Sequence, residues 1–418
     1  MVLSFPNLTK IMTFRSHSLL LACALCLPSL AKAEPKPAPL ATFPAAKLLA
    51  LAPLLKTSDL TLLEANEKGA LKQLTTLTFV AAPPELVRDV VIHPERYKDF
   101  IRNTKEDTVK VEPDGSLFHQ YAVSYSIYTV DGRHRYTLEK EGVGGAPPAV
   151  EMYDPDANGV RHYRWEFLPA AGGGTVIVLY GYTLVPRDGF LSKFLSRAPT
   201  LEFGFALIPQ MTFVLSMKQH AEQLAKEAGK RPSLPTGSPG SYEFMLERGT
   251  LALLRTGANG RITDISLVDR STARPEVLVQ VAADPAQWSK FVPSIDRSTA
   301  LGMKDGMSGT EIEQSLPLIS WTTTFASRSD GKSVDQFGLS GDLMNGRLRW
   351  DIRQTRDPGH AEIVLRAIQQ YEKGSLVIRQ LYKLEPLFEY GINVGLGLLL
   401  LQGVRQHAEQ LTQSRATR

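Results

Sequence analysis

The chain has 418 residues, of which 43% are hydrophobic and 22% charged, and its formal net charge is +4. These fractions are typical of a soluble globular protein and exclude a disordered or a membrane-spanning chain. The length is enough for two domains of ordinary size.

The N-terminus has the pattern of a secretory signal peptide. Arg15 supplies a positive charge, an apolar run follows over residues 19–27, and Ala31-Lys32-Ala33 provides the small residues that a signal peptidase accepts. We therefore predict a signal peptide over residues 1–33, with cleavage near Ala33-Glu34. The mature protein would then be secreted across the inner membrane into the periplasm.

Two other interpretations of the N-terminus are a membrane anchor and a lipoprotein signal. An anchor needs about 20 apolar residues, and the run over 19–27 is shorter. A lipoprotein signal would use Cys23, but few apolar residues precede that cysteine. Translation could also start at Met12 in place of Met1, because the charged and apolar parts of the signal follow Met12.

The predicted mature chain contains no cysteine, because Cys23 and Cys26 both lie in the signal. It therefore has no disulfide and no thiolate metal ligand. Removal of Lys10, Arg15 and Lys32 lowers the basic residues from 47 to 44, against 43 acidic residues. This balance gives no electrostatic reason to expect a nucleic acid partner.

An internal repeat runs through the rest of the sequence. Residues 60–100 match residues 251–291 at a constant separation of 191, without a gap. Further matches follow in the same order: Arg164-Trp165-Glu166 with Arg349-Trp350-Asp351, residues 175–179 with 362–366, and Gln219-His220-Ala221-Glu222-Gln223-Leu224 with the identical residues 406–411. The order of these matches predicts a tandem duplication.

The repeat also predicts where the domains begin and end. Residues 34–44 are a leader rich in proline and alanine, and residues 45–229 form the first domain. Residues 230–240 have the proline, glycine and serine content of a linker, and residues 241–418 form the second domain.

Each copy is expected to open with a hairpin, in the second copy over 250–255 and 261–268. A short helix then begins at Pro84 or Pro275, because proline is tolerated in the first helical turn. Strand-like runs follow, over 118–130, 160–167 and 175–185 in the first copy and over 310–327, 346–353 and 361–371 in the second, with an Asp131-Gly132 turn after the first of these runs.

Each copy ends in a long apolar helix, expected over 200–228 and 387–413. A helix that is apolar nearly all round must be buried on most sides. The order of elements predicts an α+β fold of two tandem helix-grip domains. In each domain a curved antiparallel sheet would wrap around the long C-terminal helix and leave an apolar cavity between sheet and helix.

These patterns resemble the START-like superfamily, also called SRPBCC, which includes polyketide cyclases, coenzyme Q-binding proteins and lipid-transfer domains. The resemblance covers nearly all of each copy. It depends on the Pro-Glu-apolar-apolar sequence at Pro84 and Pro275, the Arg-Trp-acid strand, and the terminal helix that ends in Gln-His-Ala-Glu-Gln-Leu. The resemblance implies a hydrophobic tunnel in each copy, but such folds serve many functions.

Aromatic and apolar residues on the inward strands and the terminal helices are the candidates for the cavity lining. Each of them could equally be ordinary core packing. The predicted lining residues are Tyr121, Tyr125, Trp165, Phe203, Phe205, Met211, Trp321, Trp350, Tyr390, Val394 and Leu398. Ile127 has the strand parity of Tyr121 and Tyr125, so these three side chains are expected to point the same way.

The sequence contains no recognisable catalytic or metal-binding motif. No histidine pair has the spacing of a metal site, and there is no G-x-S-x-G nucleophile sequence. His220 and His407 near the helix ends are interpreted as structural. We therefore predict no catalytic residue, no metal and no cofactor.

The sequence favours an exported, non-catalytic binding or carrier protein for a hydrophobic small molecule, such as a lipid, a quinone, or a sterol-like or polyketide-like compound. Transient membrane contact would suit such a carrier. An alternative is a cyclase or aromatase acting on a polyketide-like substrate, which would need polar groups such as Tyr125, Arg164, Glu202 or Glu389 inside the cavity. A third possibility is a structural or interaction module in which one copy has lost its cavity.

Overall fold

The computed structural model describes residues 39–125, 128–139, 148–154, 161–181, 195, 199–257, 262–316, 319–368, 379, 383 and 388–416. The predicted signal peptide, residues 34–38 of the leader, and Ile127 lie outside these ranges.

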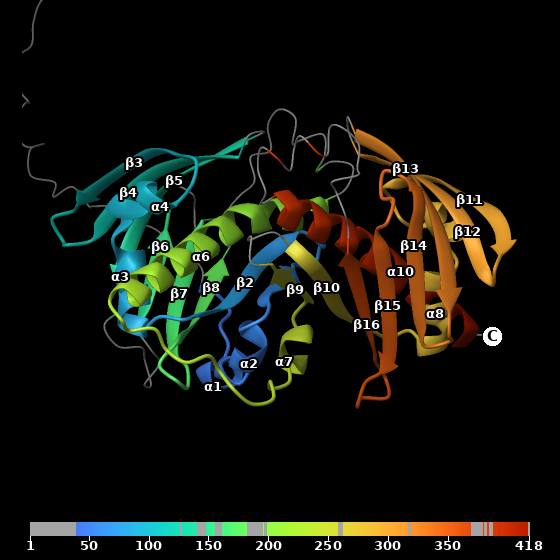
Figure 1. Ribbon diagram of the computed structural model, residues 1–418, viewed down its shortest axis with the longest axis horizontal. Helices are drawn as coiled ribbons and strands as arrows, with labels where there is room; N and C mark the ends of the chain where they lie inside the picture. Colours follow the sequence, from blue (N-terminus) through green and yellow to red (C-terminus); the bar gives the residue numbers. More distant parts are fainter. Residues whose placement is uncertain are drawn as a thin grey trace, which may run out of the picture. The chain divides into compact units, whose positions relative to one another are not determined.

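Sixteen strands within the described ranges form one antiparallel sheet (Figure 1). Their order is β11-β12-β13-β14-β15-β16-β10-β9-β1-β2-β8-β7-β6-β5-β4-β3. The N-terminal half contains β1 (Asp59–Ala65), β2 (Leu71–Val80), β3 (Thr104–Val111), β4 (Leu117–Tyr125), β5 (Tyr128–Leu138), β6 (Ala149–Tyr153), β7 (His162–Pro169) and β8 (Thr175–Gly181). The C-terminal half contains β9 (Thr250–Thr256), β10 (Ile262–Ser271), β11 (Ile295–Lys304), β12 (Met307–Leu316), β13 (Ile319–Ser329), β14 (Ser333–Gly341), β15 (Arg347–Gln354) and β16 (Ala361–Ile368).

Helices pack on both faces of this sheet. They are α1 (Ala45–Leu49), α2 (Ala52–Leu55), α3 (Pro84–Ile92), α4 (Tyr97–Phe100), α6 (Leu201–Glu227), α7 (Glu243–Leu246), α8 (Pro275–Ala283) and α10 (Phe388–Ala416), with 3-10 turns η1 (Pro94–Arg96) and η2 (Pro285–Lys290). The prolines expected to open the short helices do so in α3 and α8. Both long terminal helices are also confirmed, within three residues of their predicted ends.

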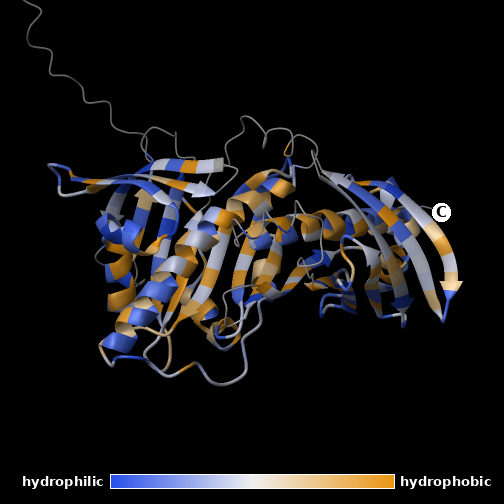
Figure 2. Ribbon diagram, turned by 45° about the horizontal axis from the view of Figure 1, so that its top comes forward, coloured by the Kyte–Doolittle hydropathy of each residue, from blue (hydrophilic) through white to orange (hydrophobic). Residues whose placement is uncertain are grey.

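The two faces of the sheet have separate cores. On the inner face, Leu179 of β8 packs with Val214 and Met217 of α6. On the outer face, the adjacent residue Val178 packs with Leu48 of α1 and with other residues of α1 and α2. Successive strand residues point to opposite faces, and both faces are covered at β8. The strand is therefore buried along its whole length, which explains its apolar sequence. Orange bands of hydrophobic residues recur along both long helices and the central strands (Figure 2).

The two halves are joined into one sheet by the pairing of β1 with β9. Thr61 pairs with its repeat equivalent Ala252, and Leu60 pairs with Leu253 while Leu62 pairs with Leu251. The sequence predicted a separate curved sheet for each copy. The edge strands of the two copies are equivalent, so they can pair with each other in a self-complementary way.

The long helices also meet through equivalent residues. A Cβ atom at Gly204 of α6 would overlap the carbonyl oxygen of Gly391 of α10, and a Cβ atom at Gly391 would lie 2.6 Å from the Gly204 oxygen. The Gly391-x-x-x-Gly395 sequence therefore serves a close helix crossing. Over the described residues, no helix is long and apolar enough to cross a membrane.

Two details of the predicted strands are wrong. Asp131-Gly132 does not form a turn but lies inside β5, and the run over 118–130 is divided between β4 and β5. The run over 310–327 is likewise divided between β12 and β13. Gly132 is extended because it pairs with Tyr121 of β4. The Tyr121 ring occupies the space that a side chain at position 132 would need, which explains why this strand position is a glycine.

One repeat match was shifted by a single residue. The sequence alignment placed Leu179 opposite Arg366. In the ladders Trp165 pairs with Leu179 and Trp350 pairs with Leu365, so Leu365 is the equivalent residue. A shift of one residue exchanges the two faces of a strand, and Arg366 therefore points to the outer face.

Candidate functional site

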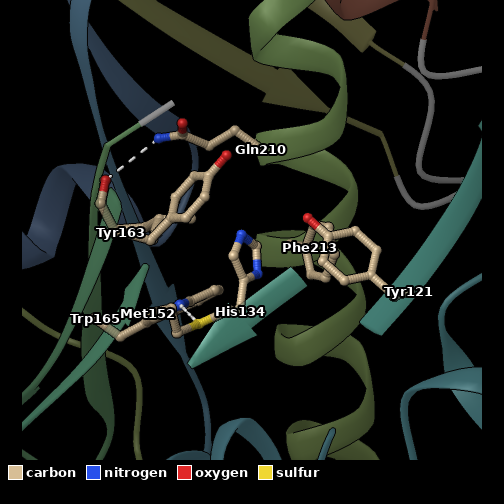
Figure 3. Close-up of a pocket in the computed structure, with 8 residues that line it drawn as sticks. Tyr121, His134, Met152, Tyr163, Trp165, Gln210 and Phe213 are labelled. Carbon is tan, nitrogen blue, oxygen red and sulfur yellow. Dashed lines mark hydrogen bonds between the residues drawn. The ribbon is translucent and has the colours of Figure 1, made fainter. Parts of the chain in front are cut away.

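A small cavity lies between α6 and the inner face of the sheet in the N-terminal half (Figure 3). Its volume is about 20 Å³. The lining residues come from five strands and the helix: Tyr121, His134, Met152, Tyr163, Trp165, Leu179, Gln210 and Phe213. The walls are therefore mostly aromatic and contain no carboxylate, lysine or arginine.

Strand alternation brings the polar and aromatic side chains to this cavity. His134 of β5 pairs with His119 of β4, and Tyr121 pairs with Gly132. A Cβ atom at position 132 would lie 2.8 Å from the Tyr121 ring, so glycine is needed for the ring to lie across β5. The alternation of β4 and β5 thus places Tyr121 and His134 on the inner face, side by side.

Aromatic rings form a continuous array around His134. The centroids of Tyr121 and His134 are 5.1 Å apart, and those of His134 and Tyr163 are 5.3 Å apart with an interplanar angle of 71°. Phe213 of α6 packs edge-on against Tyr121 at 5.7 Å. These separations are in the favourable range for aromatic pairs. The array can stack with a flat apolar molecule in the same way.

His134 is the unusual group in this array. It is 1% exposed, and neither of its ring nitrogens has a hydrogen-bond partner. Burial, with smaller contributions from the neighbouring His119 and Arg161, lowers the pKa of His134 to about 3. The imidazole is therefore neutral at pH 7, with one nitrogen able to donate and the other to accept a hydrogen bond. A buried polar group without partners is rare in native proteins and costs about 1–3 kcal/mol.

Gln210 supplies a second free polar atom. Its Nε2 donates to the Thr76 hydroxyl at 3.0 Å and to the Leu179 carbonyl at 3.3 Å. Its Oε1 is buried and has no partner. Trp165, in contrast, is satisfied, because its indole N–H donates to the Met152 sulfur at 3.0 Å. The cavity thus offers one free acceptor on Gln210 and one free donor and one free acceptor on His134.

A satisfied polar pair lies directly behind the array. The Nε2 atom of His119 is 2.7 Å from an Asp107 carboxylate oxygen, and its Nδ1 atom is 3.2 Å from the Tyr136 hydroxyl. Burial lowers the pKa of His119, although the nearby Asp107 opposes the shift. His119 therefore differs from His134 in having both nitrogens partnered, and it serves to hold the wall in place.

The cavity as it stands has room for about one water molecule, which needs roughly 10–15 Å³ and two to four polar partners. His134 and Gln210 can supply those partners. A larger ligand needs α6 or the ring array to move outward. In chemical terms the site is an apolar, aromatic compartment with neutral hydrogen-bonding groups.

The structure places the predicted lining residues in two groups. Tyr121 and Trp165 line the cavity. The other nine are buried in the hydrophobic core on the inner face but do not line it: Tyr125, Phe203, Phe205, Met211, Trp321, Trp350, Tyr390, Val394 and Leu398. The strand parity shared by Tyr121 and Tyr125 is real, because both are buried on the same face of β4.

The predicted lining did not include the other six residues of the cavity wall: His134, Met152, Tyr163, Leu179, Gln210 and Phe213. The signal for His134 was present, because Val130, His134 and Tyr136 share one parity and all are buried. The predicted turn at Asp131-Gly132 interrupted this pattern. Gln210 gave no signal, since a glutamine in an apolar helix is as compatible with solvent exposure as with a cavity.

The polar groups considered for a cyclase do not line this cavity. Arg164 lies on the outer face, where it pairs with Glu139, Glu151 and Glu166. Tyr125 and Glu202 are buried elsewhere, and Glu389 accepts a hydrogen bond from the Ile262 N–H in the other half. Over the described residues, no group of three or more histidine, cysteine or acidic side chains could hold a metal ion.

In the C-terminal half, His134 is replaced by Phe325, and Met152 is replaced by Gln336, a buried glutamine whose amide nitrogen and oxygen both have partners. Thr310 pairs with Phe325 in the ladder where His119 pairs with His134. Trp350, the equivalent of Trp165, donates its indole N–H to the Gln336 oxygen at 3.1 Å. The Phe–His stack near the helix end is shared, because His220 lies on Phe100 and His407 on Phe291, each at 4.3 Å. Among the described residues, the buried histidine without hydrogen-bond partners is therefore a feature of the N-terminal half, whereas the stack belongs to both copies.

An antiparallel sheet packed around a long C-terminal helix is the helix-grip arrangement, and the described strands contain it twice. No protein-family model and no curated protein matches the chain. The chain is similar to solved structures of START-like proteins. One is the di-domain aromatase/cyclase StfQ from the steffimycin biosynthetic pathway, at 14% identity over 82% of this chain and 99% of that chain, with a TM-score of 0.27.

Two further similar structures each cover less than half of this chain. A START superfamily protein from Mycobacterium smegmatis is 14% identical over 36% of this chain and 99% of that chain, with a TM-score of 0.28. A STAR-related lipid transfer protein from Xanthomonas axonopodis is 12% identical over 41% and 96%, with a TM-score of 0.30. Likenesses at these scores carry no argument about the ligand or activity of this chain.

Proposed function

We propose that the protein is a carrier for a hydrophobic small molecule, which binds between α6 and the sheet of the N-terminal half. The observation that carries the proposal is His134, a neutral and unpartnered imidazole that faces an aromatic cavity. A ligand that brings a hydroxyl or carbonyl group to His134 removes the cost of the unmade hydrogen bonds.

The walls favour a largely flat, apolar ligand with a polar group at one end. Ring stacking on Tyr121, Tyr163 and Phe213 would hold the apolar part, and burial contributes roughly 25 cal/mol per Å² of apolar surface. The polar end would meet His134 and Gln210. Quinones, sterol-like compounds and polyketide-like compounds have this form, and a simple alkyl lipid fits it less well. A charged ligand group is disfavoured, because the lining carries no charge to pair with it.

The cavity is too small for such a ligand, so ligand binding must be coupled to opening of the space between α6 and the sheet. We propose that the ligand displaces α6 from the strands that carry His134 and Tyr163. The C-terminal half, which has Phe325 at the position of His134, would then contribute scaffold and not a second site of the same kind.

Export remains part of the proposal. A carrier that shields an apolar molecule is useful where that molecule must cross water, as between two membranes. Fractionation of cells and N-terminal sequencing of the mature protein test it. The expected result is periplasmic protein that begins at Glu34, and a cytoplasmic protein that retains residues 1–33 would contradict it.

Ligand binding is tested by organic extraction and mass spectrometry of purified protein, followed by titration with a panel of quinones, sterols, aromatic polyketides and phospholipids. We expect a co-purifying or added apolar compound that raises the melting temperature of the wild type. The His134→Phe variant should lose most of this effect, and the matched variant Phe325→His in the other half should retain it. If extraction is clean and no panel member binds, the carrier function is wrong.

A further inference from the structure

The outer face of the sheet is covered along β7 and β8, whereas the equivalent strands β15 and β16 carry exposed side chains on that face. In the N-terminal half, Leu168 and Tyr180 are buried on that face, and the Phe43 N–H donates to the Tyr180 hydroxyl at 3.2 Å. By the strand ladders, the equivalent residues of the C-terminal half are Arg353 and Arg366. Their side chains are 67% and 54% exposed. The repeat has thus replaced a buried apolar surface by exposed arginines.

These arginines belong to a larger array on β13–β16, which lie side by side in Figure 1. Within the described residues, the outer-face array contains Arg328, Arg347, Arg349, Arg353 and Arg366, and their carboxylate partners are Asp335, Asp351 and Glu362. Five positive charges therefore meet three negative charges. The neighbouring turn adds Asp330 and Lys332, which cancel each other.

The carboxylates lie beneath the guanidinium groups. Asp335 is 9% exposed, and it is shared by Arg347 at 2.7 Å, Arg349 at 3.4 Å and Arg328 at 3.8 Å. Asp351 is shared by Arg349 at 2.9 Å and Arg366 at 3.7 Å. Each guanidinium has five N–H donors, which is more than the carboxylates of the array engage, so the array keeps donors for a further anion. Guanidinium groups presented in this way suit phosphate oxygens.

Exposed apolar side chains adjoin the array. Ile368 of β16 pairs with Arg347 of β15 and is 40% exposed. Leu339 lies on β14, on the other side of β15, and is 55% exposed. The Arg347 guanidinium stacks on the Phe337 ring at 5.2 Å. Arginines flanked by exposed aliphatic side chains are typical of surfaces that bind the interface of an anionic bilayer.

We propose that the outer face of β13–β16 docks on the phosphate headgroups of an anionic phospholipid bilayer. The arginines would contact the phosphates, and Leu339 and Ile368 would enter the headgroup region. The surface lies on the opposite side of the sheet from the proposed ligand cavity. Docking therefore does not depend on the identity of the ligand, and each proposal can fail separately.

The test is co-sedimentation of the purified protein with two kinds of vesicle, phosphatidylcholine alone and phosphatidylcholine mixed with phosphatidylglycerol. The variant combines Arg328→Gln, Arg347→Gln and Arg366→Gln. It retains Arg349, so that Asp335 and Asp351 each keep a partner and the fold is preserved. The matched control combines Lys72→Gln, Lys105→Gln and Lys110→Gln, which removes the same charge from exposed positions of the N-terminal half.

We expect the wild type to bind the mixed vesicles and to be released by salt. At about fivefold per arginine, the triple arginine variant should bind roughly a hundredfold more weakly, and the lysine control should lose much less. Equal binding to both vesicle types, or an equal loss in both triple variants, would overturn the proposal. Release of the protein by inorganic phosphate, but not by chloride of the same ionic strength, would point to a free phosphate ligand instead. Circular dichroism and melting temperature verify that both variants are folded.

Discussion

Gly204 and Gly391 are equivalent residues of the two repeats, and each leaves room for the backbone of the other where α6 crosses α10. The sheet shows the same relationship, because Thr61 pairs with its equivalent Ala252. Both contacts are self-complementary, as at the twofold axis of a symmetric dimer. The contact between the two copies therefore has the twofold geometry of a symmetric dimer interface.

This crossing predicts a large effect of a single methyl group. Gly204→Ala should destabilise the protein by about 3 kcal/mol, because the new Cβ atom overlaps the backbone of Gly391 and the two helices must separate. Urea denaturation measures the change. Gly359→Ala is the control, since its Cβ atom would meet only the Asp357 side chain, at 3.3 Å. A Gly204→Ala protein as stable as the control would contradict the close crossing.

Substitution of His134 by phenylalanine should stabilise the ligand-free protein. The change removes a buried imidazole that has no partners, which is a gain of about 1 kcal/mol, and it copies Phe325 of the other half. His119→Phe should have the opposite effect, with a loss of about 2 kcal/mol, because the Asp107 oxygen that His119 binds then lacks its partner. Chemical denaturation of both variants measures the difference. If His134→Phe were the more destabilising of the two, His134 would have a partner in solution.

The pKa of His134 predicts a specific dependence of stability on pH. Its folded-state pKa of about 3 lies below the ordinary value of 6.5, so the unfolded chain binds a proton that the folded chain does not. The contribution of His134 to the free energy of unfolding is fully present above about pH 6.5. It is lost as the pH falls toward 3, by at most about 1.4 kcal/mol per pH unit.

Other groups also titrate in this range, so the pH effect is measured as a difference. Urea midpoints of the wild type and of His134→Phe should be compared at pH 7.5, 6 and 5. About one pH unit below 6.5 is enough to reveal the effect of His134 protonation on stability. The advantage of the variant should increase as the pH falls. A constant difference across these pH values would show that His134 does not titrate as its burial implies.

The equivalent arginines Arg164 and Arg349 should differ in importance. Arg164 pairs with Glu139, Glu151 and Glu166, so Arg164→Met leaves three carboxylates close together, at a cost of about 3 kcal/mol. Arg349→Met should cost about 1 kcal/mol or less, because Asp335 keeps Arg347 and Asp351 keeps Arg366. Thermal and urea denaturation of the two variants, at low and high salt, tests this ranking, and equal losses would refute it.

The repeat carried most of the fold prediction. Leu60 and Leu251, Pro84 and Pro275, and Trp165 and Trp350 occupy corresponding places in corresponding elements. These features depend on residues close together in the chain: a proline that opens a helix, a tryptophan on an alternating strand, and a helix that is apolar on all sides. Local patterns of this kind can be recognised in a single sequence.

Three features could not be read from local patterns. The repeat match aligned Leu179 with Arg366 and not with Leu365, because only the pairing of Trp350 with Leu365 in the folded sheet distinguishes the two alignments. Gly132 was predicted in a turn, because its partner Tyr121 lies on another strand. The joining of β1 to β9 was not predicted, since an edge strand does not reveal in its sequence which other edge it meets.

The sequence by itself determined the duplication, the element order and the apolar character of the inner face, because each arises from residue periodicity and from the similarity of two segments. The tertiary structure alone decided that the two copies share one sheet, that Gly204 meets Gly391, and that His134, Tyr163 and Gln210 surround one small cavity. Those relationships join residues far apart in the chain. Their free energy depends on the distance between side chains that only the folded backbone brings together.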